Sequence, residues 1–219
     1  TLSSSSAASD VYKRQVGKHV VKQLKESEHT SIAMVRKEEQ VATMNDLGAD
    51  EVVIADLEDD FSHAFKQADA VIFAAGSGGS TGADKTLVID LWGAIKSFQY
   101  AEKASINHFV QLSSIGAGDP DGQPDKIKHY MVAKAVSDQM LMSTSLSYSI
   151  VRPGPLTNEE ATGKIKVADA FNNVGEDSIT RADVATALID SLTNKATHGK
   201  AFEILAGEEE ISNALSSLK

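Results

Sequence analysis

The amino-acid sequence predicts an α/β fold: a doubly wound, mostly parallel sheet with helices on both faces. Three observations predict it. Short apolar runs alternate along the chain with segments of helical length and helical apolar spacing. Several of the runs, such as AVIFAA at 70–75, are continuously apolar, as in strands buried on both faces. Glycine, serine or charged residues follow the ends of these runs, where open α/β sheets bind their ligands.

Composition bounds the function. The chain has 219 residues, the size of a single α/β domain. Its formal net charge of −10 argues against binding to nucleic acid or to an anionic membrane. There is no cysteine, no apolar run of membrane-spanning length and no ligand spacing among the six histidines, so we expect no disulfide, no membrane span and no metal. We expect a cytoplasmic protein, a monomer or a homodimer, acting on a small molecule.

The first 15 residues do not fit the pattern of the rest. TLSSSSAASDVYKRQ has no apolar strand, whereas GKHVVKQLKESEH, which follows Val16, is a good helix. In α/β nucleotide-binding domains such a helix follows a buried strand and a glycine-rich turn. Gly17 fits the last glycine of G-x-x-G-x-x-G, but Val11 and Arg14 occupy the two earlier glycine positions.

Two explanations compete for this segment. Either the protein has lost its phosphate-binding loop, or residues 1–15 are foreign sequence that replaces the true first strand and loop. The sequence favours the second, because the break is abrupt and DVYKRQ resembles translated adapter sequence. The domain is then 16–219, with its first strand and glycine loop replaced or missing.

The next strand carries a cofactor signal. A short apolar strand at 31–35 ends in Arg36 and Lys37. About 20 positions past the glycine turn, an acid selects NAD and a basic residue accommodates the 2′-phosphate of NADP. The sequence therefore favours NADP, with NAD possible; the alternative is a surface cation at the start of the helix 38–47, which Gly48 ends.

Two further strand ends point to the same ligand crevice. After the strand 51–55, Asp56 is placed to accept a hydrogen bond from an adenine amino group with Leu57 on the ring, or to cap a helix at 59–68. After the strand 70–75, the glycine-rich GSGGSTG leads into a long helix, 83–105. Ala74, Ala75 and Gly76 are thus expected beside the cofactor, against the alternative of a merely flexible loop.

The candidate catalytic residues lie between two strands. A strand at 108–112 ends in Ser113 and Ser114, and a later helix carries Tyr130 and Lys134 four positions apart, on one face. A nearby ammonium lowers a tyrosine pKa, and such a tyrosine gives or takes a proton near neutral pH. Tyr and Lys at this spacing also occur by chance. Their position before the strand 147–151, which leads into Arg152-Pro153-Gly154, favours the catalytic interpretation.

Beyond residue 154 we expect a small substrate lobe. It contains a short strand at 164–167, a helix at 181–192 capped by Thr180, a strand at 202–205 and a helix at 207–218. Glu208–Glu210 are expected in the first turn of that last helix, where acids complement the dipole.

From Val16 onward the chain resembles the atypical short-chain dehydrogenases/reductases, NAD(P)-binding oxidoreductases of Rossmann-like fold. The resemblance lies in AMVRKEEQ, VIFAAGSGGSTGADKTLVIDLWGAIK, HFVQLSSIGAG, HYMVAK, IVRPGPLTNEEATG and ITRADVA. It implies Tyr130 as proton donor and acceptor, Lys134 as the residue that lowers the tyrosine pKa and binds the nicotinamide ribose, and Ser114 or Ser113 as the group that orients the substrate. It also implies that the cofactor is lined by Arg36, Asp56, Ala75 and Gly76, with Pro153 near the nicotinamide.

The sequence therefore predicts an NADP-dependent oxidoreductase that moves hydride to or from a small carbonyl or alcohol. The gap between serine and tyrosine is shorter than in the sugar-nucleotide epimerase branch, which favours a small substrate. Two alternatives remain open: an NAD(P)-binding redox sensor or regulator without turnover, and a flavin-type reductase that needs no tyrosine acid.

Overall fold

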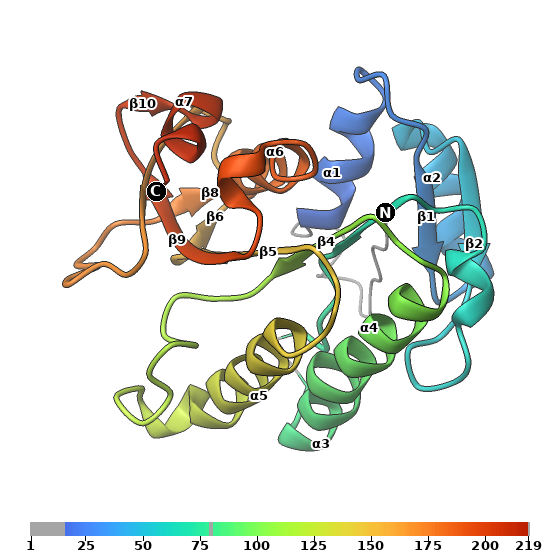
Figure 1. Cartoon of the computed structure of the whole chain (residues 1–219), viewed down its shortest axis with the longest axis horizontal. Helices are drawn as coiled ribbons and strands as arrows, with labels where there is room; N and C mark the ends of the chain where they lie inside the picture. Colours follow the sequence, from blue (N-terminus) through green and yellow to red (C-terminus); the bar gives the residue numbers. More distant parts are fainter. Residues whose placement is uncertain (1–15, 79–80, 219) are drawn as a thin grey trace.

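A computed structural model of the chain describes residues 16–78 and 81–218. The predictions for residues 1–15, including the replaced first strand and glycine loop, lie outside the described residues. Within them, the predicted α/β architecture with a mostly parallel sheet and helices on both faces is confirmed (Figure 1).

The central sheet has six strands in the order β10-β7-β9-β5-β4-β3. Four neighbours, β3 (Ala70–Phe73), β4 (His108–Leu112), β5 (Tyr148–Pro153) and β9 (Lys200–Ala206), are parallel. At one edge β7 (Lys164–Ala168) and β10 (Glu209–Glu210) run antiparallel to their neighbours. Two short strands, β6 (Leu156–Thr157) and β8 (Ile179–Thr180), pair separately beside this sheet.

A second parallel pair, β1 (Ile32–Val35) and β2 (Glu51–Ile54), continues the architecture beyond β3. In the described part of the chain no ladder joins it to the central sheet. The two nevertheless share one core, because Met34 of β1 lies in the same apolar cluster as Val71 and Phe73 of β3. Helix α1 (Val16–Leu24) spans both, packing Val20 with the central strands and Val21 with β1.

Helices cover the two faces of the sheet. Helices α4 (Ala94–Lys103) and α5 (Asp125–Met142) lie on one face, and α1, α6 (Arg181–Asp190) and α7 (Ile211–Ser216) on the other (Figure 1). Consecutive strand residues point to opposite faces: Phe109 packs under α4 and α5, and Val110 under α1 and α6. Burial on both faces is the physical reason for the continuous apolar runs.

Two predicted helices, 38–47 and 83–105, are found close to their expected positions. Residues 38–47 form η2 (Glu38–Gln40) and α2 (Val41–Leu47), which end at Gly48 with the left-handed φ of 96° that favours glycine. The long helix from residue 83 consists of α3 (Ala83–Lys85), a π-helical stretch η4 (Thr86–Gly93) and α4. At Gly93 a Cβ would come within 3.2 Å of the Leu57 Cβ, so the helix approaches its neighbour closely there.

Other segments differ from the prediction. Residues 59–68 hold only the 3₁₀ turn η3 (Ser62–Phe65), because the Asp60 carboxylate accepts the Ser62 amide hydrogen and Phe61 turns inward against Tyr100. The last helix starts at Ile211, since Glu209 and Glu210 extend to pair with β7. The strand expected at 164–167 lies in the central sheet, between β9 and β10, and a short 3₁₀ turn, η5 (Lys195–Thr197), precedes β9.

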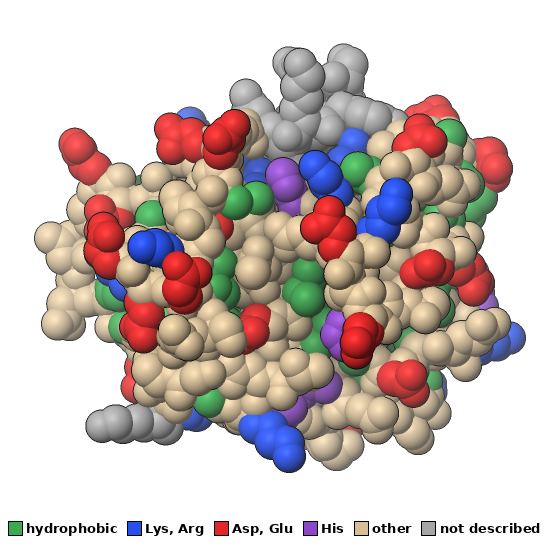
Figure 2. All heavy atoms as spheres, turned by 90° about the horizontal axis from the view of Figure 1, so that it is seen from above, with side chains coloured by type: hydrophobic (Ala, Val, Ile, Leu, Met, Phe, Trp, Pro, Cys, Tyr) green, Lys and Arg blue, Asp and Glu red, His purple; other side chains and the backbone are tan. Residues whose placement is uncertain are grey.

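The charged side chains in the view of Figure 2 do not mark a binding site. Figure 2 shows one face, on which Lys and Arg side chains lie among Asp and Glu side chains rather than in one large basic patch. No helix built by residues 16–78 and 81–218 is long and apolar enough to cross a membrane. The same residues contain no group of three or more His, Asp or Glu side chains arranged to hold a metal ion.

Candidate active site

The candidate site lies at the carboxyl ends of β3, β4 and β5, with α5 alongside. Ser113 and Ser114 directly follow β4, and the glycine-rich loop follows β3. Helix α5 begins at Asp125, so Tyr130 lies in its second turn and Lys134 one turn later. The geometry brings the predicted serine, tyrosine and lysine elements to one end of the sheet.

Lys134 fastens α5 to the end of β4. Its side chain is almost fully buried, with 3% of its surface exposed, and its Nζ donates a 2.7 Å hydrogen bond to the Leu112 carbonyl oxygen. Burial lowers the pKa of the ammonium, while the carboxylates of Asp90 and Asp138 act in the opposite direction. The lysine therefore fixes the position of α5, and hence that of Tyr130, relative to the end of β4.

Tyr130 has a perturbed pKa, but not in the predicted direction. Burial of the phenol, followed by the negative charges of Asp90 and Asp138, raises the pKa of Tyr130 well above its ordinary value. The prediction of a lowered tyrosine pKa is thus wrong for this arrangement, because desolvation and then the two carboxylates all raise the pKa, while the Lys134 ammonium is bonded to the Leu112 carbonyl oxygen. A phenol held in its protonated form is suited to donate a proton.

The two serines have different environments. Ser113 is buried, and its hydroxyl donates to Asp138 Oδ2 at 2.9 Å. Ser114 is partly exposed, and within residues 16–78 and 81–218 its hydroxyl makes only a local 3.1 Å bond to the Ile115 carbonyl oxygen. Of the pair, Ser114 is the one with a hydroxyl available to a substrate oxygen.

A buried polar cluster supports these residues from below. Asp138 accepts from Gln111 Nε2 at 2.6 Å and, through its other oxygen, from Arg152 Nε at 2.9 Å. The Arg152 guanidinium also lies beneath the loop between β4 and α5, since a Cβ at Gly118 would come within 3.3 Å of Nη1. The cluster ties β4, β5 and α5 together at the base of the site.

The loop after β3 fits a dinucleotide. A Cβ at Gly76 would lie 2.8 Å from Asp90 Oδ1, closer than real Cβ contacts, so a side chain at this position would displace the Asp90 carboxylate. The next amide, Ser77 N–H, donates to Asp90 Oδ2 at 2.9 Å. Ala75 is buried and Ala74 is partly buried before it. Bare backbone at the carboxyl end of a parallel strand is what close passage of a nucleotide cofactor requires.

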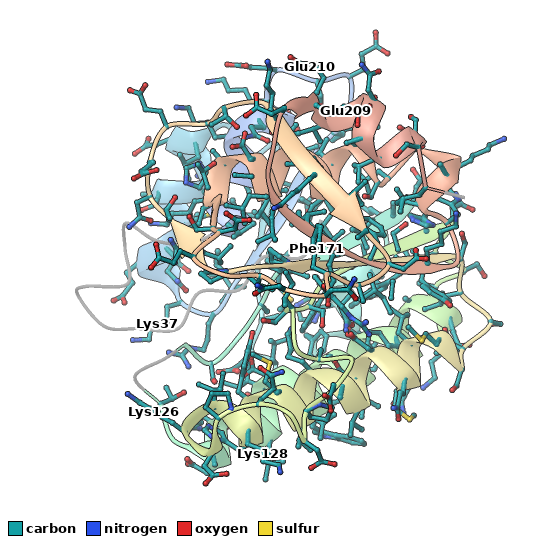
Figure 3. All side chains as sticks on the ribbon, turned by 90° about the vertical axis from the view of Figure 1, so that its left-hand side faces the viewer. Lys37, Lys126, Lys128, Phe171, Glu209 and Glu210 are labelled. Atoms are coloured by element: carbon teal, nitrogen blue, oxygen red, sulfur yellow. The ribbon has the colours of Figure 1, made fainter. Side chains whose placement is uncertain are left out.

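The predicted phosphate-reading residues lie at the end of β1. The backbone amides of Arg36 and Lys37 both donate to Gln40 Oε1, at 3.1 and 2.9 Å, which fixes the turn. The Arg36 side chain is partly exposed and that of Lys37 is exposed. Figure 3 shows Lys37 and, in the first turn of α5, Lys126 at the same edge of that view.

The remaining predicted cofactor residues have different environments. Asp56 Oδ1 accepts the Glu58 amide hydrogen in a local turn, and Leu57, 3% exposed, belongs to the core and leaves little surface for an adenine ring. Gly17 is buried in the first turn of α1. Pro153 is the last residue of β5, and its carbonyl oxygen accepts from Ile115 N at 3.0 Å.

Sequence reasoning missed three charged residues: Asp90, Asp138 and Arg152. Asp138 follows Lys134 by four positions on the same helix, a spacing that places both on one face. Asp90 is the single acid in the apolar run TLVIDLWG, where an unpaired charge is unexpected. Both signals were present in the sequence.

Comparison with known proteins decides the family. The NAD(P)H-binding family model matches residues 13–195. The chain belongs to the NAD(P)H-binding family. Members of this family that resemble the chain are NAD(P)-binding proteins of oxidoreductase or epimerase type.

Three relatives of this NAD(P)H-binding protein span nearly its whole length. A Bacillus subtilis protein described as an uncharacterized sugar epimerase is 41% identical, with 93% of this chain and 95% of the relative covered. A Bacillus halodurans structure, provisionally described as an NAD-dependent epimerase/dehydratase, is 49% identical, with a TM-score of 0.90 and coverage of 93% and 95%. An oxidoreductase structure from Lactococcus lactis is 33% identical, with a TM-score of 0.80 and coverage of 94% and 93%.

Proposed function

We propose that this protein is an NADP-dependent oxidoreductase that exchanges hydride with a small carbonyl or alcohol, with Tyr130 as the acid. One observation carries the proposal: Tyr130 and Lys134 share a side of α5, and Lys134 is bonded to the end of β4 immediately before Ser113 and Ser114. Membership of the NAD(P)H-binding family supports the cofactor class.

Each residue has a distinct task in this proposal. NADPH, when bound, supplies the hydride. Tyr130, with its raised pKa, donates a proton to the carbonyl oxygen as negative charge develops there. Ser114 donates a second hydrogen bond to the same oxygen, and Lys134 holds the helix that carries the tyrosine. The raised tyrosine pKa favours the direction of reduction, since oxidation of an alcohol needs the phenolate.

The preference for NADP over NAD is also part of the proposal. Arg36 lies directly after β1 with a partly exposed side chain, and no acid lies at that position. A guanidinium there would meet the 2′-phosphate of NADP, whereas NAD offers only a hydroxyl.

Replacement of Tyr130 by Phe tests the catalytic assignment. Consumption of NADPH with a panel of small aldehydes, ketones and quinones would be followed by the absorbance of the reduced nicotinamide. We expect Tyr130→Phe to lower kcat by about 10²–10⁴-fold while NADPH affinity changes little. Tyr148→Phe, a partly buried tyrosine of β5, is the matched control and should retain activity. Unchanged turnover in Tyr130→Phe would remove the tyrosine from the mechanism and favour flavin-type hydride donation.

A second candidate, an epimerase, is favoured by the descriptions of the two Bacillus relatives. An epimerase returns its hydride to the substrate, so the assay separates the two: a reductase consumes NADPH stoichiometrically, whereas an epimerase consumes none while substrate and product interconvert. Binding of NADPH with no conversion of any kind would instead favour a sensor or regulator.

A further inference from the structure

Asp90 is a buried acid for which the proposed mechanism has no role. It is 2% exposed and lies in η4, the π-helical stretch between α3 and α4. π-Helical turns are rare and frequently occur at functional sites. A buried carboxylate is costly unless its charge is paired or hydrogen-bonded, so the presence of Asp90 in an otherwise apolar helix needs an explanation.

The contacts of Asp90 point toward the cofactor loop. Oδ2 accepts the Ser77 amide hydrogen at 2.9 Å, and Oδ1 lies where a Cβ at Gly76 would collide with it. The carboxylate thus closes the end of β3 from the helix side. It also explains why Gly76 is glycine, since any side chain would displace the group that holds the loop.

The charges around Asp90 point toward the catalytic helix. Helix α5 packs against η4, and the Asp90 carboxylate acts electrostatically on both Tyr130 and Lys134. Asp138, the other acid that acts on these two residues, forms a direct ion pair with Arg152. Asp90 forms no ion pair with any residue in 16–78 or 81–218, so its contact with the loop is its hydrogen bond from Ser77.

We propose that Asp90 is a positioning residue: its carboxylate, buried in η4, fixes the Gly76–Ser77 loop at the carboxyl end of β3. The loop held in this way shapes the wall along which the cofactor passes. That consequence for the cofactor rests on the proposed function, whereas the fixing of the loop is measured without cofactor or substrate.

The loop is tested by amide hydrogen exchange at Ser77. Asp90→Ala removes the acceptor, and we expect the Ser77 amide to exchange at least about ten-fold faster than in the parent, while Asp90→Asn retains protection. Asp90→Asn is the matched control, because it keeps an oxygen that accepts the Ser77 amide hydrogen and removes only the charge. Equal protection of the Ser77 amide in Asp90→Ala and in the parent would overturn the proposal. Absence of turnover in the parent together with faster exchange at Ser77 in Asp90→Ala would overturn the proposed function and leave the role of Asp90 standing.

Discussion

Arg152 Nε donates to Asp138 Oδ2 at 2.9 Å, in an ion pair whose side chains are 13% and 1% exposed. The same carboxylate accepts from Ser113 and Gln111, so one acid satisfies donors from β4 and β5 while belonging to α5. Because Tyr130 and Lys134 are on that helix, the ion pair sets where the catalytic side chains lie relative to the strand ends.

Removal of one partner should therefore destabilise the protein strongly. Asp138→Ala leaves the Arg152 guanidinium, which is 13% exposed, without its ion-pair partner, and we expect the free energy of unfolding to fall by about 3–5 kcal/mol. The matched control is Glu58→Ala, which breaks the exposed 2.7 Å pair with Lys85 and should cost less than about 1 kcal/mol. Urea unfolding of both variants provides the comparison; similar losses in the two would contradict the structural importance of the buried pair.

A histidine pair at the opposite end of the sheet should make stability depend on pH. His108 is buried at the start of β4, bonded to Ser147 Oγ at 2.8 Å and Ser149 Oγ at 3.0 Å, and stacked on His198 with ring centroids 3.8 Å apart. Burial, with a smaller contribution from His198, lowers the pKa of His108 to about 4. The folded protein thus favours the neutral ring.

The sign follows from linkage. Because the folded pKa lies below the unfolded value, the stabilisation is fully present above about pH 6.5 and is lost as the pH falls toward 4. We expect the free energy of unfolding to be about 2 kcal/mol lower at pH 5 than at pH 8 on account of His108. His108→Gln should lose most of this difference in urea titrations, whereas His29→Gln, an exposed histidine, should keep it. An undiminished difference in His108→Gln would assign the pH dependence to other groups.

Arg36 should decide between the two nicotinamide cofactors. Arg36→Gln removes the cation at the end of β1, and we expect NADPH to bind roughly ten-fold or more weakly while NADH binding is nearly unchanged, since one charge-assisted hydrogen bond is worth about 1.5–3 kcal/mol. Lys126→Gln, at the start of α5, serves as a control for general loss of positive charge. Equal weakening of both cofactors would mean that Arg36 does not read the 2′-phosphate.

Much of the fold was predictable because the burial of a strand or a helix determines which of its residues are apolar, and this pattern can be read from the sequence. The strands of the central sheet that are buried on both faces appear as continuous apolar runs, and Gly48 and Thr180 end and begin helices as their chemistry dictates. The failures have local causes. Residues 59–68 have helical composition, but tertiary packing of Phe61 against Tyr100 overrides it. Glu209 and Glu210 are residues typical of a helix start, yet they pair with the edge of β7 and form a strand.

The candidate site was predictable in position more than in electrostatics. The order of strand ends placed Ser114, Tyr130 and Lys134 together. The pKa of Tyr130 is raised by burial of the phenol, and then by Asp90, which lies 40 residues earlier in η4, and Asp138, which lies two turns later in α5. Spacing along one helix indicates only that Tyr130 and Lys134 share a side of it, so the sequence predicted the wrong direction for the tyrosine pKa.

Binding of NADPH and NADH is the measurement that tests the central claim most directly. Each cofactor would be titrated, by the fluorescence of its nicotinamide, into the chain as it stands and into a variant in which an apolar strand and a G-x-x-G-x-x-G turn ending at Gly17 replace residues 1–15. We predict that the variant binds NADPH more tightly than NADH, and more tightly than the unaltered chain does. If neither protein binds either cofactor, the claim that this is an NADP-dependent oxidoreductase is contradicted.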